Sequence, residues 1–346
     1  MGNPIASLIE NPVLQARLLR VRIAALGLAR DYWKDPKPRG KAQGGLFSFL
    51  DKKGLFSRKA STPAKPVSRT ADIADFVVPP AQDGMAGAET TEEIRDWMAD
   101  RIQVMEVMWG AGSSFPGGAA YIDALASPLG LNDEASVLDL GAGLGDMARK
   151  LAEDYKCYVT GLEANQTLAQ RGMIMSIAAA KSKKAPVTFY DPAEYSATRK
   201  YDCIIAREVF CRVVGKEKFF KAVDASLKNG GGQIVFTDFV LNPSMREKPA
   251  IVKWLEREKA MAPLTQLELI KTWKGMGYDL RIAEDQTALY KNNILAGLVD
   301  LVPYMRTNVP DVDTKRTVVR EVDFWSRRLA ALGHGLKYYR FYGIKY

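Results

Sequence analysis

The feature that most constrains this chain is a glycine-rich stretch, VLDLGAGLG at 137–145. It begins as a buried strand, and glycines then stand at 141, 143 and 145. Glycine adopts positive φ freely and lets a ligand approach the backbone closely. A strand that passes through such a turn into a helix presents backbone N–H groups to a ligand, typically a nucleotide. The stretch therefore predicts a nucleotide-type site; the alternative is a glycine-rich turn that binds nothing.

Segments of strand and helix composition alternate around this stretch in the 346-residue chain. Such alternation is typical of a parallel sheet with helices on both faces. The expected fold class is therefore α/β, with a doubly wound, mostly parallel, Rossmann-like seven-stranded sheet. The strands are expected at 135–143, 157–164, 187–192, 201–208, 231–241, 278–285 and 336–346.

Residues 1–90 differ in composition from the rest and form a predicted N-terminal extension, partly helical and partly disordered. Residues 1–70 hold 14 Lys and Arg against 4 Asp and Glu, while the remaining residues are almost neutral. A basic amphipathic helix is expected at 8–33, followed by linker segments rich in Pro, Gly and Lys. Three interpretations stay open: a solvated arm, an anchor on an anionic membrane surface, and contact with RNA or a partner protein.

Cysteine and histidine usage limits the chemistry of the chain. Its three cysteines show no CxxC spacing, and His334 is its one histidine. Zinc sites, disulfide frameworks and multi-histidine metal sites are therefore disfavoured, and no metal is expected.

No run approaches the ~18 apolar residues of a membrane span. The expected location is the cytoplasm, at the inner membrane face if the arm binds lipid.

Acidic residues follow three successive predicted strands at Asp139, Glu163 and Asp191. Glu163 lies 22 residues beyond Gly141, a spacing suited to accepting hydrogen bonds from ribose hydroxyls. Asp191 is placed to accept from an adenine amino group. The glycine spacing is GAGLG and not the GxGxxG of dinucleotide sites. S-adenosylmethionine, which has no pyrophosphate, fits this pattern better than a dinucleotide.

From about residue 100 to its end the chain resembles class I S-adenosylmethionine-dependent methyltransferases. The resemblance rests on VLDLGAGLG, GLEA, YDPAE, YDCIIAREVF and LKNGGGQIVFTDF. More narrowly, MWGAGSSFPGG and AREVFCRVVGKEKFF are similar to segments of phosphoethanolamine and related small-amine N-methyltransferases. The resemblance implies a set of cofactor-binding residues: Asp139, Gly141, Ala142, Gly143, Gly145, Glu163, Ala164, Asp191, Pro192, Arg207 and Glu208.

The chain departs from that narrower group at two acceptor-site positions. Arg212 stands where the group has a histidine, and Phe239 stands where it has a tyrosine. Without a histidine base, the candidate catalytic residues are Glu208 and Asp238. Candidate acceptor contacts are Trp109, Arg212 and Arg328.

The predicted catalytic domain spans 91–346, and the segments 91–118 and 288–332 are expected to form a lid over the acceptor. The expected enzyme activity is methyl transfer to nitrogen or oxygen of a small molecule or lipid headgroup. One alternative is an RNA or protein methyltransferase that uses the basic arm, although the neutral body disfavours nucleic acid. Another is a non-catalytic module that binds S-adenosylmethionine. The sequence does not predict the oligomeric state.

Overall fold

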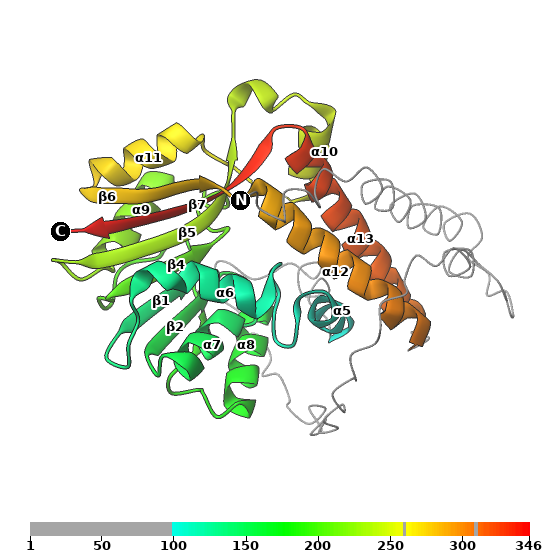
Figure 1. Cartoon of the computed structure of the whole chain (residues 1–346), viewed down its shortest axis with the longest axis horizontal. Helices are drawn as coiled ribbons and strands as arrows, with labels where there is room; N and C mark the ends of the chain where they lie inside the picture. Colours follow the sequence, from blue (N-terminus) through cyan, green and yellow to red (C-terminus); the bar gives the residue numbers. More distant parts are fainter. Residues whose placement is uncertain (1–98, 259–260, 308–310) are drawn as a thin grey trace, which may run out of the picture. The chain divides into compact units, whose positions relative to one another are not determined.

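The computed structural model describes residues 99–258, 261–307 and 311–346. The arm at 1–90 and the amphipathic helix expected at 8–33 lie outside these residues. Within the described part, seven strands form one sheet in the order β3-β2-β1-β4-β5-β7-β6 (Figure 1). The strands are β1 Ser136–Leu140, β2 Tyr158–Glu163, β3 Val187–Phe189, β4 Cys203–Arg207, β5 Gly232–Leu241, β6 Tyr278–Asp285 and β7 Leu336–Lys345.

The sheet confirms the predicted fold class. β1 pairs in parallel with β2 and β4, and the parallel series continues to β3 and β5. β7 is antiparallel to both β5 and β6, between which it lies. The strand order reverses between β1 and β4, where α/β sheets bind ligands beyond the carboxyl ends of their strands.

Helices cover both faces of the sheet in the described part of the chain. Residues alternate along β5: Val235 and Phe239 join the core under α6 and α7, whereas Ile234 and Phe236 pack with α9 and α11. This two-sided burial explains why the central strands β1, β4 and β5 are mainly apolar. The helices are α5 Ala99–Trp109, α6 Gly118–Ala126, α7 Asp146–Asp154, α8 Gln166–Ala178, α9 Lys216–Ala225, α10 Pro249–Arg257, α11 Gln266–Gly275, α12 Thr287–Thr307 and α13 Val312–Gly333.

The stretch expected to be helical at 288–332 consists of two helices, α12 and α13. The Asp311 side chain accepts a hydrogen bond from the Thr314 backbone N–H (2.7 Å) and so caps the start of α13. Figure 1 shows α12 and α13 beside one another at one end of the sheet, next to α5. Trp109 of α5 and Trp325 of α13 meet edge to face, with ring centroids 4.9 Å apart. Among the described residues, no helix is long and apolar enough to cross a bilayer.

Candidate functional site

The glycine-rich stretch forms a tight turn from β1 into α7. Gly141, Gly143 and Gly145 all have positive φ, at 71°, 57° and 78°. The backbone N–H groups of Gly141 and Ala142 donate to the carbonyl of Leu162 in β2, at 2.9 and 3.1 Å. The turn is thereby fixed to the neighbouring strand at the point where the strand order reverses.

Side chains would not fit at these glycines. A Cβ at Gly141 would lie 2.8 Å from the Arg207 carbonyl oxygen, and one at Gly143 would collide with the Ser114 hydroxyl. The positive φ values would strain any other residue as well. Glycine is therefore required by the close approach of two other segments, the end of β4 and the loop after α5.

Asp139 is a fully buried carboxylate beneath this turn, and neither of its oxygens has a hydrogen-bond partner. The nearest cation is Arg207, whose Nη2 lies 3.9 Å from Oδ2. Burial raises the pKa of Asp139 from 3.8 to about 7, although Arg207 opposes the shift. Buried polar groups are normally satisfied, so an orphaned carboxylate at a glycine turn suits a positively charged ligand group.

Glu163 ends β2 and accepts two backbone hydrogen bonds. Its Oε2 accepts from Gly143 N–H (2.7 Å) and its Oε1 from Asn165 N–H (2.9 Å). Burial raises its pKa. Glu163 therefore holds the glycine turn against β2, and Ala164 lies between it and the Asn165 cap of α8.

The third predicted acid, Asp191, follows β3. Its carboxylate accepts from the Ala193 N–H (2.8 Å), so that Pro192 is held in a turn at the third strand end. Both Asp191 and Pro192 are half-buried. The structure thus places the three acidic loops at the carboxyl ends of the adjacent strands β1, β2 and β3, as the sequence predicts.

The loop between α5 and α6 lies over the glycine turn. Ser113 Oγ donates to Asp146 Oδ2 (2.5 Å), and Arg207 Nη2 donates to Oδ1 of the same carboxylate (2.8 Å). The Phe115 ring stacks on the Arg207 guanidinium, with 4.2 Å from Cζ to the ring centroid. Burial tends to raise the pKa of Asp146, but the charge of Arg207 outweighs it and the pKa is lowered. Asp146 therefore links the loop to the end of β4.

Glu208 directly follows β4 and has a left-handed backbone, with φ of 56°. Its carboxylate is buried and accepts from the Tyr290 hydroxyl (2.6 Å) and from Arg328 Nη1 (3.1 Å). Tyr290 belongs to α12 and Arg328 to α13, so both helices are joined to the carboxyl end of β4.

The two arginines predicted to contact the acceptor share a second carboxylate, Glu258, at the end of α10. Arg328 binds it through Nε (2.6 Å) and Nη2 (2.5 Å), and Arg212 binds it through Nη2 (3.1 Å). The Arg328 guanidinium also stacks on Phe239 and Trp325, at 5.0 and 4.7 Å from the ring centroids. We call Glu208, Arg212, Glu258 and Arg328 the buried ionic cluster, although part of the Arg212 side chain reaches solvent.

Asp238, the second candidate catalytic residue, lies in β5 next to this cluster. Its Oδ2 accepts from the Cys211 N–H (2.9 Å) and its Oδ1 from the Phe239 N–H (2.7 Å). Burial raises its pKa to about 6. Trp109, the remaining acceptor candidate, is buried in the contact of α5 with α13, and its indole N–H has no hydrogen-bond partner.

Comparison with known proteins adds independent evidence. Residues 118–281 match the family model described as a methyltransferase domain. This region of the chain is a methyltransferase domain. A glycine/sarcosine/dimethylglycine N-methyltransferase of Actinopolyspora halophila is 27% identical to this chain over 128 residues, which is 36% of this chain and 22% of that protein.

Solved structures share the fold of the methyltransferase domain. Phosphoethanolamine N-methyltransferase 2 of Haemonchus contortus, in complex with S-adenosyl-L-methionine, aligns with a TM-score of 0.64 at 17% identity. The alignment covers 75% of this chain and 60% of that one. The cyclopropane synthase MmaA2 of Mycobacterium tuberculosis aligns with a TM-score of 0.58 at 13% identity, over 73% of this chain and 98% of that one. The chain thus spans less than two thirds of the first two relatives.

Several residues around the methyltransferase site were not predicted from the sequence. Asp146 had a usable signal, because it opens the helix directly after the glycine turn. Ser113, Tyr290 and Glu258 had none, because their partners are distant in the sequence. Among the described residues, no group of three or more His, Cys, Asp or Glu is arranged to hold a metal ion.

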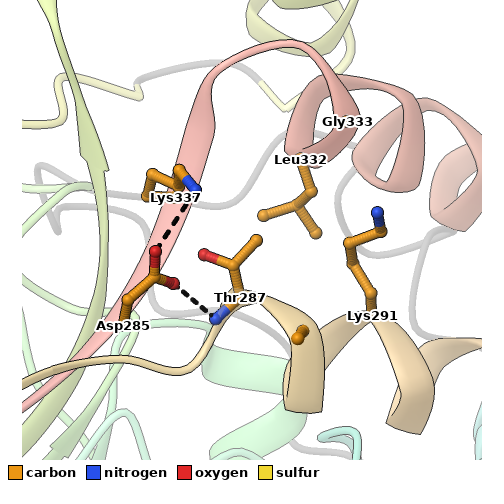
Figure 2. A pocket seen from close by; sticks show the side chains of 7 residues that line it. Asp285, Thr287, Lys291, Leu332, Gly333 and Lys337 are labelled. Atoms are coloured by element: carbon orange, nitrogen blue, oxygen red, sulfur yellow. Dashed lines mark hydrogen bonds and ion pairs between the residues drawn. The ribbon is translucent and has the colours of Figure 1, made fainter. Parts of the chain in front are cut away.

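A separate surface pocket of about 470 Å³ lies between the start of α12 and the end of α13 (Figure 2). Figure 2 shows Lys337 and Thr287 both bound to Asp285, by an ion pair of 3.2 Å and a backbone hydrogen bond of 2.8 Å. Lys291 and Leu332 line the opposite side. None of the predicted site residues lines this pocket.

Proposed function

We propose that this chain transfers a methyl group from S-adenosylmethionine to nitrogen or oxygen of a small-molecule or lipid-headgroup acceptor. The observation that carries the proposal is Asp139, a buried carboxylate without a hydrogen-bond partner beneath a turn that only glycine fits. The methyltransferase family match and the N-methyltransferase relatives support the same activity.

The residues at the three strand ends suit each part of this cofactor. Asp139 and the turn from Gly141 to Gly145, with Ala142 between, suit the cationic amino-acid portion. Glu163 and Ala164 suit the ribose, and Asp191 with Pro192 suits the adenine edge. When bound, the cofactor supplies a methyl group activated by a sulfonium. The acceptor lone pair forms the new bond to the methyl carbon, and the electron pair of the broken carbon–sulfur bond stays on sulfur.

The protein contributes positioning and exclusion of water. Ser113, Phe115, Asp146 and Arg207 hold the α5–α6 loop over the glycine turn, where it shields the reacting atoms. A protonated acceptor must lose its proton before transfer. Asp238 is the better placed of the two candidate bases, because its partners are two backbone N–H groups and the uncharged Cys211 side chain, whereas Glu208 is paired with Arg328.

Calorimetric titration with S-adenosylmethionine and S-adenosylhomocysteine, with NADH for comparison, tests the proposal. We expect micromolar binding of the first two and none of NADH. Gly143→Ala places a methyl group against Ser114 at positive φ and should weaken binding at least tenfold. Gly275→Ala is the control, because its Cβ meets open space at ordinary φ. Absence of binding, or equal binding by Gly143→Ala, would overturn the proposal.

A further inference from the structure

We propose that the methyl acceptor is an amine that carries no phosphate or carboxylate group. This inference rests on the proposed function and names its substrate class. Nine of the eleven predicted cofactor residues lie at the ends of β1, β2 and β3, and the other two, Arg207 and Glu208, lie at the end of β4. An acceptor in line with the methyl group must therefore approach from the ends of β4 and β5, which α12 and α13 adjoin through Glu208.

The arginines on this side already have carboxylate partners. Arg328, 3% exposed, uses Nε and Nη2 for Glu258 and Nη1 for Glu208 and Tyr290. Arg212 lies 3.1 Å from Glu258 and 3.7 Å from Glu208. The buried ionic cluster therefore contains two arginines and two glutamates, and it has no net charge.

Arg207, at the end of β4, is committed to Asp146 in the same way. An anionic acceptor group would have to displace a carboxylate from one of these arginines. That carboxylate would then remain buried without its partner, which is strongly unfavourable. The cluster is consequently a poor receptor for phosphate or carboxylate.

The remaining carboxylates at the strand ends are not hydrogen-bonded to a basic side chain. Arg207 lies 3.9 Å from Asp139, but its hydrogen bond goes to Asp146. Asp238 and Glu163 accept hydrogen bonds from backbone N–H groups, and Asp139 has no hydrogen bond at all. The field at the carboxyl edge is therefore negative. It favours the cationic cofactor and a protonated amine and repels anions. The proton that the amine gives up before transfer passes to a carboxylate at these strand ends, and its freed lone pair then takes the methyl group.

The decisive experiment compares acceptors in matched pairs, using the full chain and S-adenosylmethionine labelled in its methyl group. Ethanolamine is compared with phosphoethanolamine, and sarcosine methyl ester with sarcosine. We also expect acceptors in a small-molecule extract to be retained by a cation exchanger and to pass an anion exchanger. A tenfold or greater preference for the member without the anion supports the inference. Preference for the anionic member, or acceptor activity retained only by the anion exchanger, overturns it.

A charge-neutralising variant gives a second readout. Glu258→Gln removes one of the two carboxylates that the arginines share and leaves the cluster with a net charge of +1, so it should raise the relative use of phosphoethanolamine over ethanolamine at least tenfold. Glu256→Gln, on the exposed side of the same helix, should leave that ratio unchanged.

If Glu258→Gln does not fold, Arg212→Gln replaces it, because that side chain is 43% exposed. A selective loss of phosphoethanolamine use in Arg212→Gln would show that Arg212 holds the anion and would overturn the inference. An equal change for both members of the pair supports it. Absence of S-adenosylmethionine binding would instead refute the proposed function itself, and calorimetry separates that failure from a wrong acceptor class.

Discussion

Asp139→Asn tests whether the buried carboxylate is kept ionised for a ligand at a cost in stability. Burial raises the pKa of Asp139 from 3.8 to about 7, so folding opposes its ionisation. Below pH 3.8 the ionisation of Asp139 does not affect the free energy of unfolding. The free energy of unfolding then falls as the pH rises towards 7, and above that the loss is constant. At pH 8 the ionised side chain destabilises the free protein by about 4 kcal/mol, of which about 2.5 kcal/mol develops between pH 5 and pH 8.

Asparagine has nearly the same shape and does not titrate. We therefore expect the stability of Asp139→Asn relative to wild type to increase by about 2.5 kcal/mol between pH 5 and pH 8. Urea denaturation of both proteins without ligand at the two pH values measures this difference, and other groups that titrate cancel in the comparison. The variant should also bind S-adenosylmethionine at least tenfold more weakly. A stability difference that does not change with pH would refute the reasoning.

Three further predictions concern the loop, the ionic cluster and the arm. Ser113→Ala removes the hydrogen bond to Asp146 and should weaken S-adenosylmethionine binding about fivefold by calorimetry; unchanged affinity would contradict a role of the loop in binding. Arg328→Gln should lower the free energy of unfolding by about 3–5 kcal/mol in urea, because two buried glutamates lose their buried basic partner and keep only the partly exposed Arg212. Arg327→Gln, which breaks a partly exposed pair, should cost less than about 1 kcal/mol. Deletion of residues 1–70 should abolish retention on anionic vesicles if the arm is a membrane anchor, and equal retention would exclude that interpretation.

The parts of the fold that could be predicted from the sequence are those determined by residues close to one another along the chain. The central strands β1, β4 and β5 are mainly apolar runs bounded by turn residues, and the glycine turn joins β1 directly to α7. The acids at or near the carboxyl ends of β1, β2 and β3 lie on the same side because parallel neighbouring strands end at the same edge. These features need no knowledge of distant contacts, and all seven strands were correctly predicted.

The buried ionic cluster could not be predicted from local signals. Glu208, Glu258 and Arg328 are separated by 50 to 120 positions and meet only because α10 and α13 pack together at the end of β4. Helix α10 itself was not expected, and its partner Arg328 was predicted only as an acceptor contact. Burial of Arg328 depends on the aromatic rings of Phe239 and Trp325, which come from different elements.

The backbone conformation of Glu208 and the partners of its carboxylate help to decide whether this residue positions other groups or removes a proton. A non-glycine residue at φ of 56° costs about 1 kcal/mol or more, and glycine at this position would relieve the strain. The backbone N–H of Glu208 is fixed to Thr237, while its carboxylate is bound by Tyr290 and Arg328. The carboxylate therefore compensates for the strain by joining α12 and α13 to the strand end. A base with those partners must break an ion pair to use its lone pair, so we propose that Glu208 has a positioning role and that Asp238 removes the proton.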